Sequence, residues 1–181
     1  MARILVLYGT TERHTEKIAA AIGRSLTALG LDVRLIEAGT QDPLPSFYDG
    51  VIVAASLHAG KYQKTVAAWV RGHLAELNAR PAAFVTVCLA AASKRPGAAV
   101  EVDAISKRFV DQLGWRPAVT KAVAGALLYT QYNVFIRWFM RRIAAKEGGD
   151  TDTSRDYEYT DWGDLRRFSQ QFGRRILAAA A

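Results

Sequence analysis

The feature that most constrains this chain is a regular alternation between short apolar segments and longer segments with helical periodicity. Apolar segments rich in strand-forming residues lie at residues 3–8, 31–36, 50–55, 82–89 and 119–127. Apolar residues recur at helical spacing in residues 15–29, 66–77, 99–113 and 161–180. This alternation is typical of a parallel sheet covered by helices on both faces. The sequence therefore predicts a three-layer α/β fold with a doubly wound, five-stranded parallel sheet.

Residues 128–159, between the fifth predicted strand and the last helix, exceed what a five-stranded fold of this kind requires. Gly125 interrupts the strand just before them. Residues 132–145 (YNVFIRWFMRRIAA) are spaced as an amphipathic helix, and the polar residues after them indicate an irregular return. Insertions of this length inside a compact domain are often functional. No repeat or linker is evident, so residues 1–181 are predicted to form a single domain with an insertion at about 128–159.

The charge of the chain narrows the choice of ligand without identifying it. Lys and Arg number 24 against 17 Asp and Glu, a formal net charge of +7. This balance suits nucleic acid, an anionic membrane surface or an acidic ligand. No zinc-finger, RRM or helix-turn-helix pattern accompanies the basic residues, which disfavours nucleic acid.

Nothing in the sequence predicts export or a membrane span. The N-terminal apolar run is too short for a signal peptide, and no segment reaches the roughly 20 apolar residues that cross a bilayer. We therefore expect a cytoplasmic protein. The single cysteine, Cys88, has no partner for a disulfide or a metal-binding motif, so we expect a buried core side chain and no metal site.

In an open parallel sheet, ligands bind beyond the carboxyl ends of the strands, where the strand order reverses. The loop after the first strand offers hydroxyl groups and the positive end of a helix, which together suit a phosphate. Its candidate residues are Thr10, Thr11, Glu12, Arg13, His14 and Thr15. The loop has neither a Walker lysine nor the G-x-G-x-x-G spacing, which favours a mononucleotide over ATP or a dinucleotide. The alternative is that Thr10 and Thr15 only cap the helix.

Two further loops should reach the same edge of the sheet. The loop after the third strand offers Ser56, Leu57, His58, Gly60 and Tyr62, and the loop after the fourth offers Leu89, Ala90, Ala91 and Ser93. Tyr62 would either stack on a ligand ring or pack at a helix start. His58 would either contact the ligand or lie at the surface. The loop after the fourth strand would otherwise be an ordinary solvated turn.

Several motifs together resemble one known family. They are ILVLYGTTERHT near the start, ASLHAGKY, QLGWRP at 112–117, AGALLY at 124–129, and GGDTDT through YTDW at 148–162. Over nearly its whole length the chain resembles the flavodoxin-like, quinone-dependent protoporphyrinogen IX dehydrogenases of bacterial haem synthesis. The phosphate loop alone would indicate only a flavodoxin-like fold, whereas AGALLY, the basic aromatic insertion and the GGDTDT and YTDW motifs are much more specific.

The resemblance implies a non-covalently bound FMN, with its phosphate over residues 10–15 and its ring near residues 56–62 and 89–95. It also implies oxidation of protoporphyrinogen IX to protoporphyrin IX, with the electrons passed to a quinone. The long insertion is the feature that the resemblance associates with an enzyme rather than with an electron carrier. One departure is Arg13, which stands where flavodoxins usually have glycine.

The insertion carries side chains suited to an apolar substrate with anionic groups. We hypothesise that Arg137, Arg141 or Arg142 binds the propionates of the porphyrinogen while Trp138 or Phe139 lines its apolar face. A further hypothesis is that this helix contacts an anionic membrane surface, because quinones reside in lipid. An amphipathic helix simply docked on the domain is the alternative to both.

Three other functions share the predicted fold. A flavodoxin-type electron carrier tends to be acidic, which the charge of +7 disfavours. An NAD(P)H:quinone oxidoreductase would use the same cofactor, although no distinct nicotinamide-binding pattern is present. A receiver-type signalling domain needs acidic residues after the first and third strands, where this chain has Gly9, Thr10 and Ser56.

Overall fold

The computed structural model describes residues 1–146 and 148–179, and its centre is a five-stranded parallel sheet. The strand order is β2-β1-β3-β4-β5, so the order reverses between β1 and β3. The strands are β1 (Arg3–Gly9), β2 (Asp32–Glu37), β3 (Gly50–Ser56), β4 (Ala82–Cys88) and β5 (Val119–Ala124). Every neighbouring pair in this sheet is parallel. The predicted fold class is confirmed.

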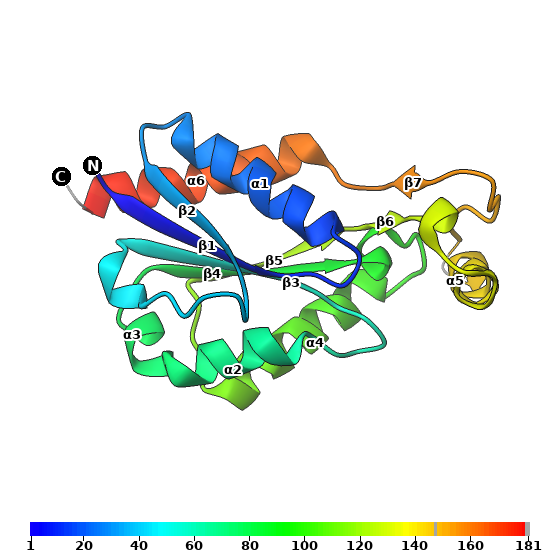
Figure 1. Ribbon diagram of the computed structural model, residues 1–181, viewed down its shortest axis with the longest axis horizontal. Helices are drawn as coiled ribbons and strands as arrows, with labels where there is room; N and C mark the ends of the chain where they lie inside the picture. The colour runs from blue at the N-terminus through cyan, green and yellow to red at the C-terminus, as the bar shows by residue number, and fades with distance from the viewer. Residues whose placement is uncertain (147, 180–181) are drawn as a thin grey trace.

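Helices cover both faces of the sheet (Figure 1). Helices α1 (His14–Thr27) and α6 (Trp162–Ala179) lie on one face. Helices α2 (Lys64–Gly72), α3 (Leu74–Asn78) and α4 (Ala98–Leu113) lie on the other. Two hydrophobic layers result, one containing Ile22 and Phe172 and the other Trp69 and Trp115. Because both faces are covered, β3 and β4 are buried along their whole length.

The single helix predicted at residues 66–77 is wrong, because the chain forms α2 and α3 with a break between them. His73 leaves the helical conformation, with φ −119° and ψ 22°. Gly72, a poor helix former, precedes it, and the His73 ring lies 2.7 Å from the Asp42 carboxylate and against Trp69. Those tertiary contacts hold His73 outside the helix.

The last helix begins where its predicted cap lies. The sequence offers Thr160 and Asp161 as caps, and Asp161 Oδ1 accepts a hydrogen bond of 2.8 Å from the backbone N–H of Asp164, so Asp161 caps α6. The predicted C-terminal end at Ala180 lies outside the described residues. Helix α4 ends at Leu113, as predicted, and Gly114 after it adopts a left-handed conformation with φ 73°.

The fifth strand is shorter than the predicted 119–127. It ends at Ala124, and the chain then leaves the main sheet at Gly125. Residues Ala126–Leu127 form β6, which pairs antiparallel with β7 (Tyr157–Glu158). The return that was expected to be irregular therefore contains a strand, because the two ends of the insertion hydrogen-bond to each other.

The insertion contains helix α5 (Val134–Lys146), whose first turn is capped by Asn133 Oδ1 accepting from Ile136 N–H at 2.9 Å. The described residues also form three short 3₁₀ turns: η1 (Pro45–Phe47), η2 (Leu89–Ala92) and η3 (Tyr129–Gln131). Figure 1 shows α5 beyond the end of the sheet, well away from both helical layers. A small cluster of Leu127, Tyr129, Tyr132 and Ala144 holds it there. Across the described residues, no helix combines the length and apolarity needed to span a bilayer.

Candidate functional site

A cavity of about 550 Å³ opens at the carboxyl ends of the strands, beside the point where the strand order reverses. Its size lies within the usual range for small-molecule sites, and its lining is mainly apolar with a few polar groups. Most of the predicted site residues line it, namely Thr10, Glu12, His14, Thr15, Ser56, Leu57, His58, Gly60, Leu89 and Ala90. The structure therefore brings the three predicted loops together.

The loop between β1 and α1 has the features of an anion site. Arg13 adopts a left-handed conformation with φ 61°, so the chain takes a glycine-like turn there despite the arginine side chain. Arg13, at the N-cap of α1, makes no capping hydrogen bond with its side chain. The Thr10 hydroxyl is buried without a hydrogen-bond partner in the described part of the chain, and it lines the cavity. Free amides at a helix start and an unpaired hydroxyl are suitable donors for a phosphate.

Glu12, in the same loop, joins it to the insertion. Its Oε2 accepts a hydrogen bond of 2.6 Å from the Tyr132 hydroxyl. Burial, together with this bond, raises the pKa of Tyr132 well above its usual value. Tyr132 therefore remains a neutral donor, and the carboxylate is directed toward the insertion.

His14 makes a second link between these regions. Its Nε2 lies 2.9 Å from Thr160 Oγ1, and the Thr160 hydroxyl donates to Ala124 O at 2.7 Å. Because that hydroxyl has one proton, we assign the His14 proton to Nε2. Burial lowers the pKa of His14, although Glu158, 4.0 Å from Nδ1, acts in the opposite direction. A neutral imidazole therefore borders the cavity at the start of α1.

The loop after β3 forms a tight turn at the cavity rim. His58 and Lys61 exchange two backbone hydrogen bonds, and the residues between them, Ala59 and Gly60, have φ values of 48° and 75°. Left-handed backbone at both central positions is typical of a type I′ turn. His58 lines the cavity but is exposed at its edge.

Gln63 connects this loop to the phosphate loop. Its Nε2 donates to Ser56 Oγ at 2.5 Å and to Thr11 Oγ1 at 3.0 Å. Thr11 is thus held outside the cavity lining. Sequence reasoning missed Gln63, because a polar residue at a helix start has no distinctive signature. Gly9, at the end of β1, allows this approach, since a Cβ there would lie 3.0 Å from Gln63 Oε1.

Tyr62 does not line the cavity. Its hydroxyl lies 2.9 Å from Thr86 Oγ1 and 3.2 Å from Ser106 Oγ, and its ring packs against Phe84 and Phe109. These contacts match the packing interpretation of Tyr62 rather than ring stacking on a ligand. Cys88 borders the cavity as a buried side chain, and burial raises the pKa of its thiol to about 11.

The other residues predicted for the site do not all line the main cavity. Leu89 and Ala90 line the main cavity, whereas Ala91 and Ser93 line two separate, smaller ones. Arg13 is exposed at the loop surface, where it pairs with Glu16. Helix α4 adds lining residues that sequence reasoning missed, namely Glu101, Val102 and Ile105. Their helical spacing is visible in the sequence, but it does not distinguish a cavity wall from ordinary core.

Helix α5 faces the cavity through Phe139, Met140 and Ile143. The other proposed substrate residues lie outside the lining, namely Arg137, Trp138, Arg141 and Arg142. Arg137 donates from Nη2 to Tyr132 O at 3.1 Å, so it holds the start of the helix. The Arg142 guanidinium lies over the Trp138 ring, 5.2 Å from its centroid, on the exposed side. Phe139 is thus the predicted aromatic residue that reaches the cavity.

Comparisons with known proteins agree with this architecture. A family model described as a flavodoxin domain matches residues 5–154. A Leishmania major relative named protoporphyrinogen IX dehydrogenase (quinone) is 35% identical over 179 residues, which is 97% of this chain and 77% of the relative. The protein of the same name from Escherichia coli strain K12 is 29% identical over 170 residues, 93% of each chain.

Solved structures show the same fold at lower identity. A flavodoxin from Streptococcus pneumonia TIGR4 superposes with a TM-score of 0.57 at 17% identity, covering 98% of this chain and 99% of its own. Oxidised flavodoxin 1 from Bacillus cereus gives a TM-score of 0.56 at 15% identity, covering 96% and 98%. The chain belongs to the flavodoxin-domain family and, within it, to the quinone-dependent protoporphyrinogen IX dehydrogenases that its motifs resemble.

Proposed function

We propose that this protein oxidises protoporphyrinogen IX to protoporphyrin IX with a non-covalently bound FMN and passes the electrons to a quinone. The names of its relatives, which align over nearly the whole chain, support this reaction. The observation that carries the cofactor assignment is the buried, unpartnered Thr10 hydroxyl beside the uncapped N-terminus of α1. A phosphate ester there would satisfy both sets of donors at once.

The protein's contribution would be to bind, orient and exclude water. FMN, when bound, would supply the acceptance of hydride from the substrate and the later release of electrons. Thr10, Thr15 and the first amides of α1 would hold its phosphate, and Leu57, Leu89 and Ala90 would provide apolar contact for its ring. Cys88 would remain a protonated, inert neighbour, because its pKa lies far above neutral pH.

The macrocycle would lie against the inner edge of α5. Phe139, Met140 and Ile143 provide an apolar surface across the cavity from the sheet. Propionates at the open side would meet Arg141 or Arg142, both of which are exposed. Arg137 is less suitable, because its guanidinium already donates to Tyr132 O. Holding the substrate against the ring in this way would provide the close approach that hydride transfer requires.

The outer side of α5 supports a proposal of peripheral membrane contact on the cytoplasmic face. Phe135 is 85% exposed and Trp138 is 59% exposed, next to Arg141 and Arg142 on a helix that has no acidic residue between Val134 and Lys146. Exposed aromatics beside cations complement an anionic bilayer surface. Flotation with anionic vesicles should carry the protein upward in low salt, and absence of flotation at any salt concentration would exclude the contact.

One assay tests the proposed reaction against its rivals. Purified protein should be yellow, and anaerobic mixing with protoporphyrinogen IX and a quinone should produce fluorescent porphyrin faster than a protein-free control. Rapid reduction by NADPH without porphyrinogen oxidation would instead indicate an NAD(P)H:quinone oxidoreductase. A bound flavin that neither compound reduces would indicate an electron carrier. Colourless protein that takes up no added FMN would overturn the cofactor assignment.

A further inference from the structure

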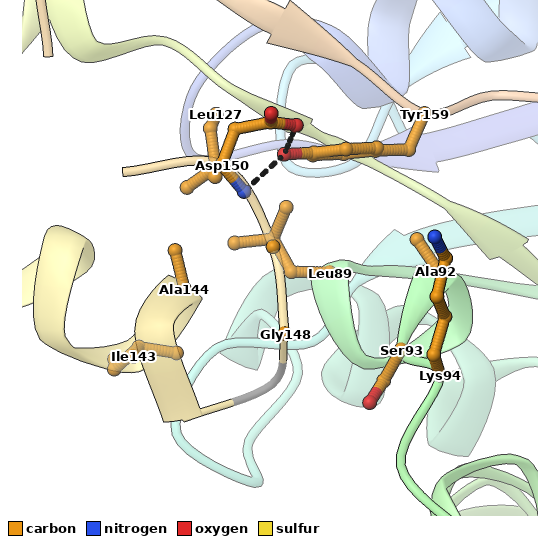
Figure 2. Close-up of a pocket in the computed structure, with 11 residues that line it drawn as sticks. Leu89, Ala92, Ser93, Lys94, Leu127, Ile143, Ala144, Gly148, Asp150 and Tyr159 are labelled. Atoms are coloured by element: carbon orange, nitrogen blue, oxygen red, sulfur yellow. Dashed lines mark hydrogen bonds between the residues drawn. The ribbon is translucent and has the colours of Figure 1, made fainter. Parts of the chain in front are cut away.

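A second cavity, of about 290 Å³, lies between η2 and the C-terminal end of α5 (Figure 2). Its apolar walls are formed by Leu89, Ala92, Leu127, Ile143 and Ala144. Leu89 and Ile143 line both this cavity and the larger one. A ring bound here would therefore be separated from the larger cavity by a single layer of side chains.

The walls of this cavity are fixed by hydrogen bonds rather than formed by a loose loop. Gly149 N–H donates to Ala144 O at 2.8 Å, and the Tyr129 hydroxyl donates to Asp150 O at 2.8 Å. The Tyr159 hydroxyl donates to Asp150 Oδ2 at 2.7 Å and accepts from Asp150 N–H at 3.2 Å, the pair drawn with dashed lines in Figure 2. Hydrogen bonds within the insertion therefore hold this wall of the cavity in place.

The charged groups of the cavity select a neutral ligand. Lys94 brings an ammonium group to one side, where it has no hydrogen-bond or ion-pair partner among the described residues. Asp150 brings a carboxylate to the other side, already bonded to Tyr159. An anion attracted by Lys94 would be repelled by Asp150, and a cation attracted by Asp150 would be repelled by Lys94. A flat, neutral ring with a carbonyl acceptor fits both the apolar walls and the free donor.

We infer that this cavity binds the head group of the quinone, with the Lys94 ammonium donating a hydrogen bond to one quinone carbonyl. The inference rests on the proposed function, which requires a quinone as electron acceptor. The volume suits a single substituted ring and is too small for a tetrapyrrole. Substrate and acceptor would then occupy neighbouring cavities and would not have to exchange in one.

The reaction in this cavity balances with the groups present. The quinone gains a pair of electrons and a pair of protons and leaves as a quinol. The electrons would come from porphyrinogen oxidation, by way of a bound flavin, across the layer that contains Leu89 and Ile143. One proton comes from Lys94, which regains it from solvent, and the other comes from solvent directly. The exposed apolar side chains of α5, which also walls the cavity, provide a surface for the quinone's apolar tail.

Ala92→Leu tests the inference by filling the cavity from η2, and Lys94→Met removes the donor while keeping a long side chain. Matched controls are Ala99→Leu, at an exposed position in α4, and Lys107→Met, an exposed lysine of the same helix. The flavin-loaded protein is titrated with ubiquinone-1 by calorimetry. We expect Ala92→Leu to weaken binding about tenfold or more and Lys94→Met to weaken it severalfold, with both controls unchanged.

Stopped-flow measurements provide a second readout. Photoreduced protein is mixed with ubiquinone-1, and separately the oxidised protein is mixed with protoporphyrinogen IX. We expect Ala92→Leu to slow reoxidation by the quinone while leaving reduction by porphyrinogen at the wild-type rate. Equal losses in both half-reactions would show that the cavity holds part of the porphyrinogen, and unchanged quinone binding would show that the quinone lies elsewhere. Either result overturns the inference.

The two proposals fail differently. If porphyrinogen does not reduce the protein but photoreduced protein is reoxidised by ubiquinone-1 and Ala92→Leu slows this step, the quinone cavity stands and the proposed substrate is wrong. If porphyrinogen reduces the wild-type protein but ubiquinone-1 neither binds it nor reoxidises it, the quinone cavity is wrong.

Discussion

The central sheet and helix α5 differ in the burial of their apolar side chains. In β1, β3 and β4 the apolar residues are buried between two helical layers, and Phe84 has no exposed surface at all. In α5 only Ala144 is buried, while Val134 is 76% exposed and Phe135 85% exposed. Burial of apolar surface is the main source of folding free energy, so these α5 side chains contribute little to the stability of the isolated chain. The difference indicates that the sheet maintains the fold, and it supports the proposal that α5 contacts a ligand or a surface.

The largest expected effect compares a phenylalanine from each region. Phe84→Ala removes a ring packed against Tyr62, Phe109 and Trp115, so we expect a loss of about 3–5 kcal/mol in the free energy of unfolding. Phe135→Ala removes an exposed ring and should cost less than about 0.5 kcal/mol. Urea unfolding measures both. A loss for Phe135→Ala close to that for Phe84→Ala would show that α5 packs against the protein in solution.

The next effect concerns the junction between the two regions, where the proposed phosphate site lies. Thr10→Ala removes a buried hydroxyl without breaking any hydrogen bond of the described chain, so it should leave stability nearly unchanged. FMN affinity should fall about 10- to 100-fold, as expected for one hydrogen bond to a charged group, and further when Thr15→Ala is added.

Fluorescence titration of the apoprotein with FMN measures this affinity. Thr120→Ala, at an exposed position in β5, is the matched control and should bind FMN like the wild type. An unchanged Kd in the Thr10 and Thr15 double variant would place the phosphate elsewhere.

A smaller effect is expected for membrane contact. Replacing Trp138 by alanine removes an exposed ring of α5, and we expect about tenfold weaker partitioning onto anionic vesicles. Phe47→Ala is a suitable control, because Phe47 is 61% exposed but lies in η1, outside the insertion. Vesicle co-sedimentation compares the two. Equal weakening in both variants would mean that general hydrophobicity, rather than α5, controls the contact.

The smallest expected effect is a pH dependence of the free energy of unfolding that arises from His14, which lies beside Glu158 and Thr160. Burial lowers the pKa of His14 below its ordinary 6.5, so the unfolded chain takes up a proton more readily than the folded one. Stability from this group is therefore fully present above pH 6.5 and is lost as the pH falls from 6.5 through the lowered folded-state pKa. His14→Gln retains an N–H donor for Thr160 and removes the titration.

Chemical unfolding at several pH values between about 5 and 8 tests this dependence. The wild type should lose stability toward the acid end, and His14→Gln should lose less. Glu158 titrates lower: burial acts to raise its pKa, but hydrogen bonds from Lys17 and Trp162 lower it overall. Its contribution is therefore retained until the pH falls below about 4.5. Identical pH profiles for the two proteins would show that His14 does not titrate in this range.

Much of the fold could be predicted because its signals are local and periodic. The buried strands, the left-handed Gly114 and the Asp161 cap each follow from a few neighbouring residues. The errors in the prediction arose where long-range contacts override the local pattern. His73 leaves the helix in contact with Asp42, and the fifth strand ends early because Gly125 lies where β6 turns away to pair with β7.

The candidate site shows the same division. The three loops were predictable, since the order of strands along the chain implies that their carboxyl ends meet. The role of Gln63 and the inward packing of Tyr62 were not, because each depends on partners that are distant in sequence or on the opposite face of the sheet. Similarly, helical spacing showed that α5 is amphipathic but could not show which of its sides faces the cavity.

By itself, the sequence determined the layered α/β architecture and the family, and it predicted a phosphate site in the loop after β1, since these depend on periodicity and on contiguous motifs. Only the tertiary structure decided that Phe139 rather than Trp138 reaches the cavity, that Glu12 and His14 tie the phosphate loop to the insertion, and that a second cavity lies beside the first. The physical reason is that local patterns determine which surfaces a segment can bury. The surface that a segment does bury depends on the summed free energy of its contacts with all of its partners.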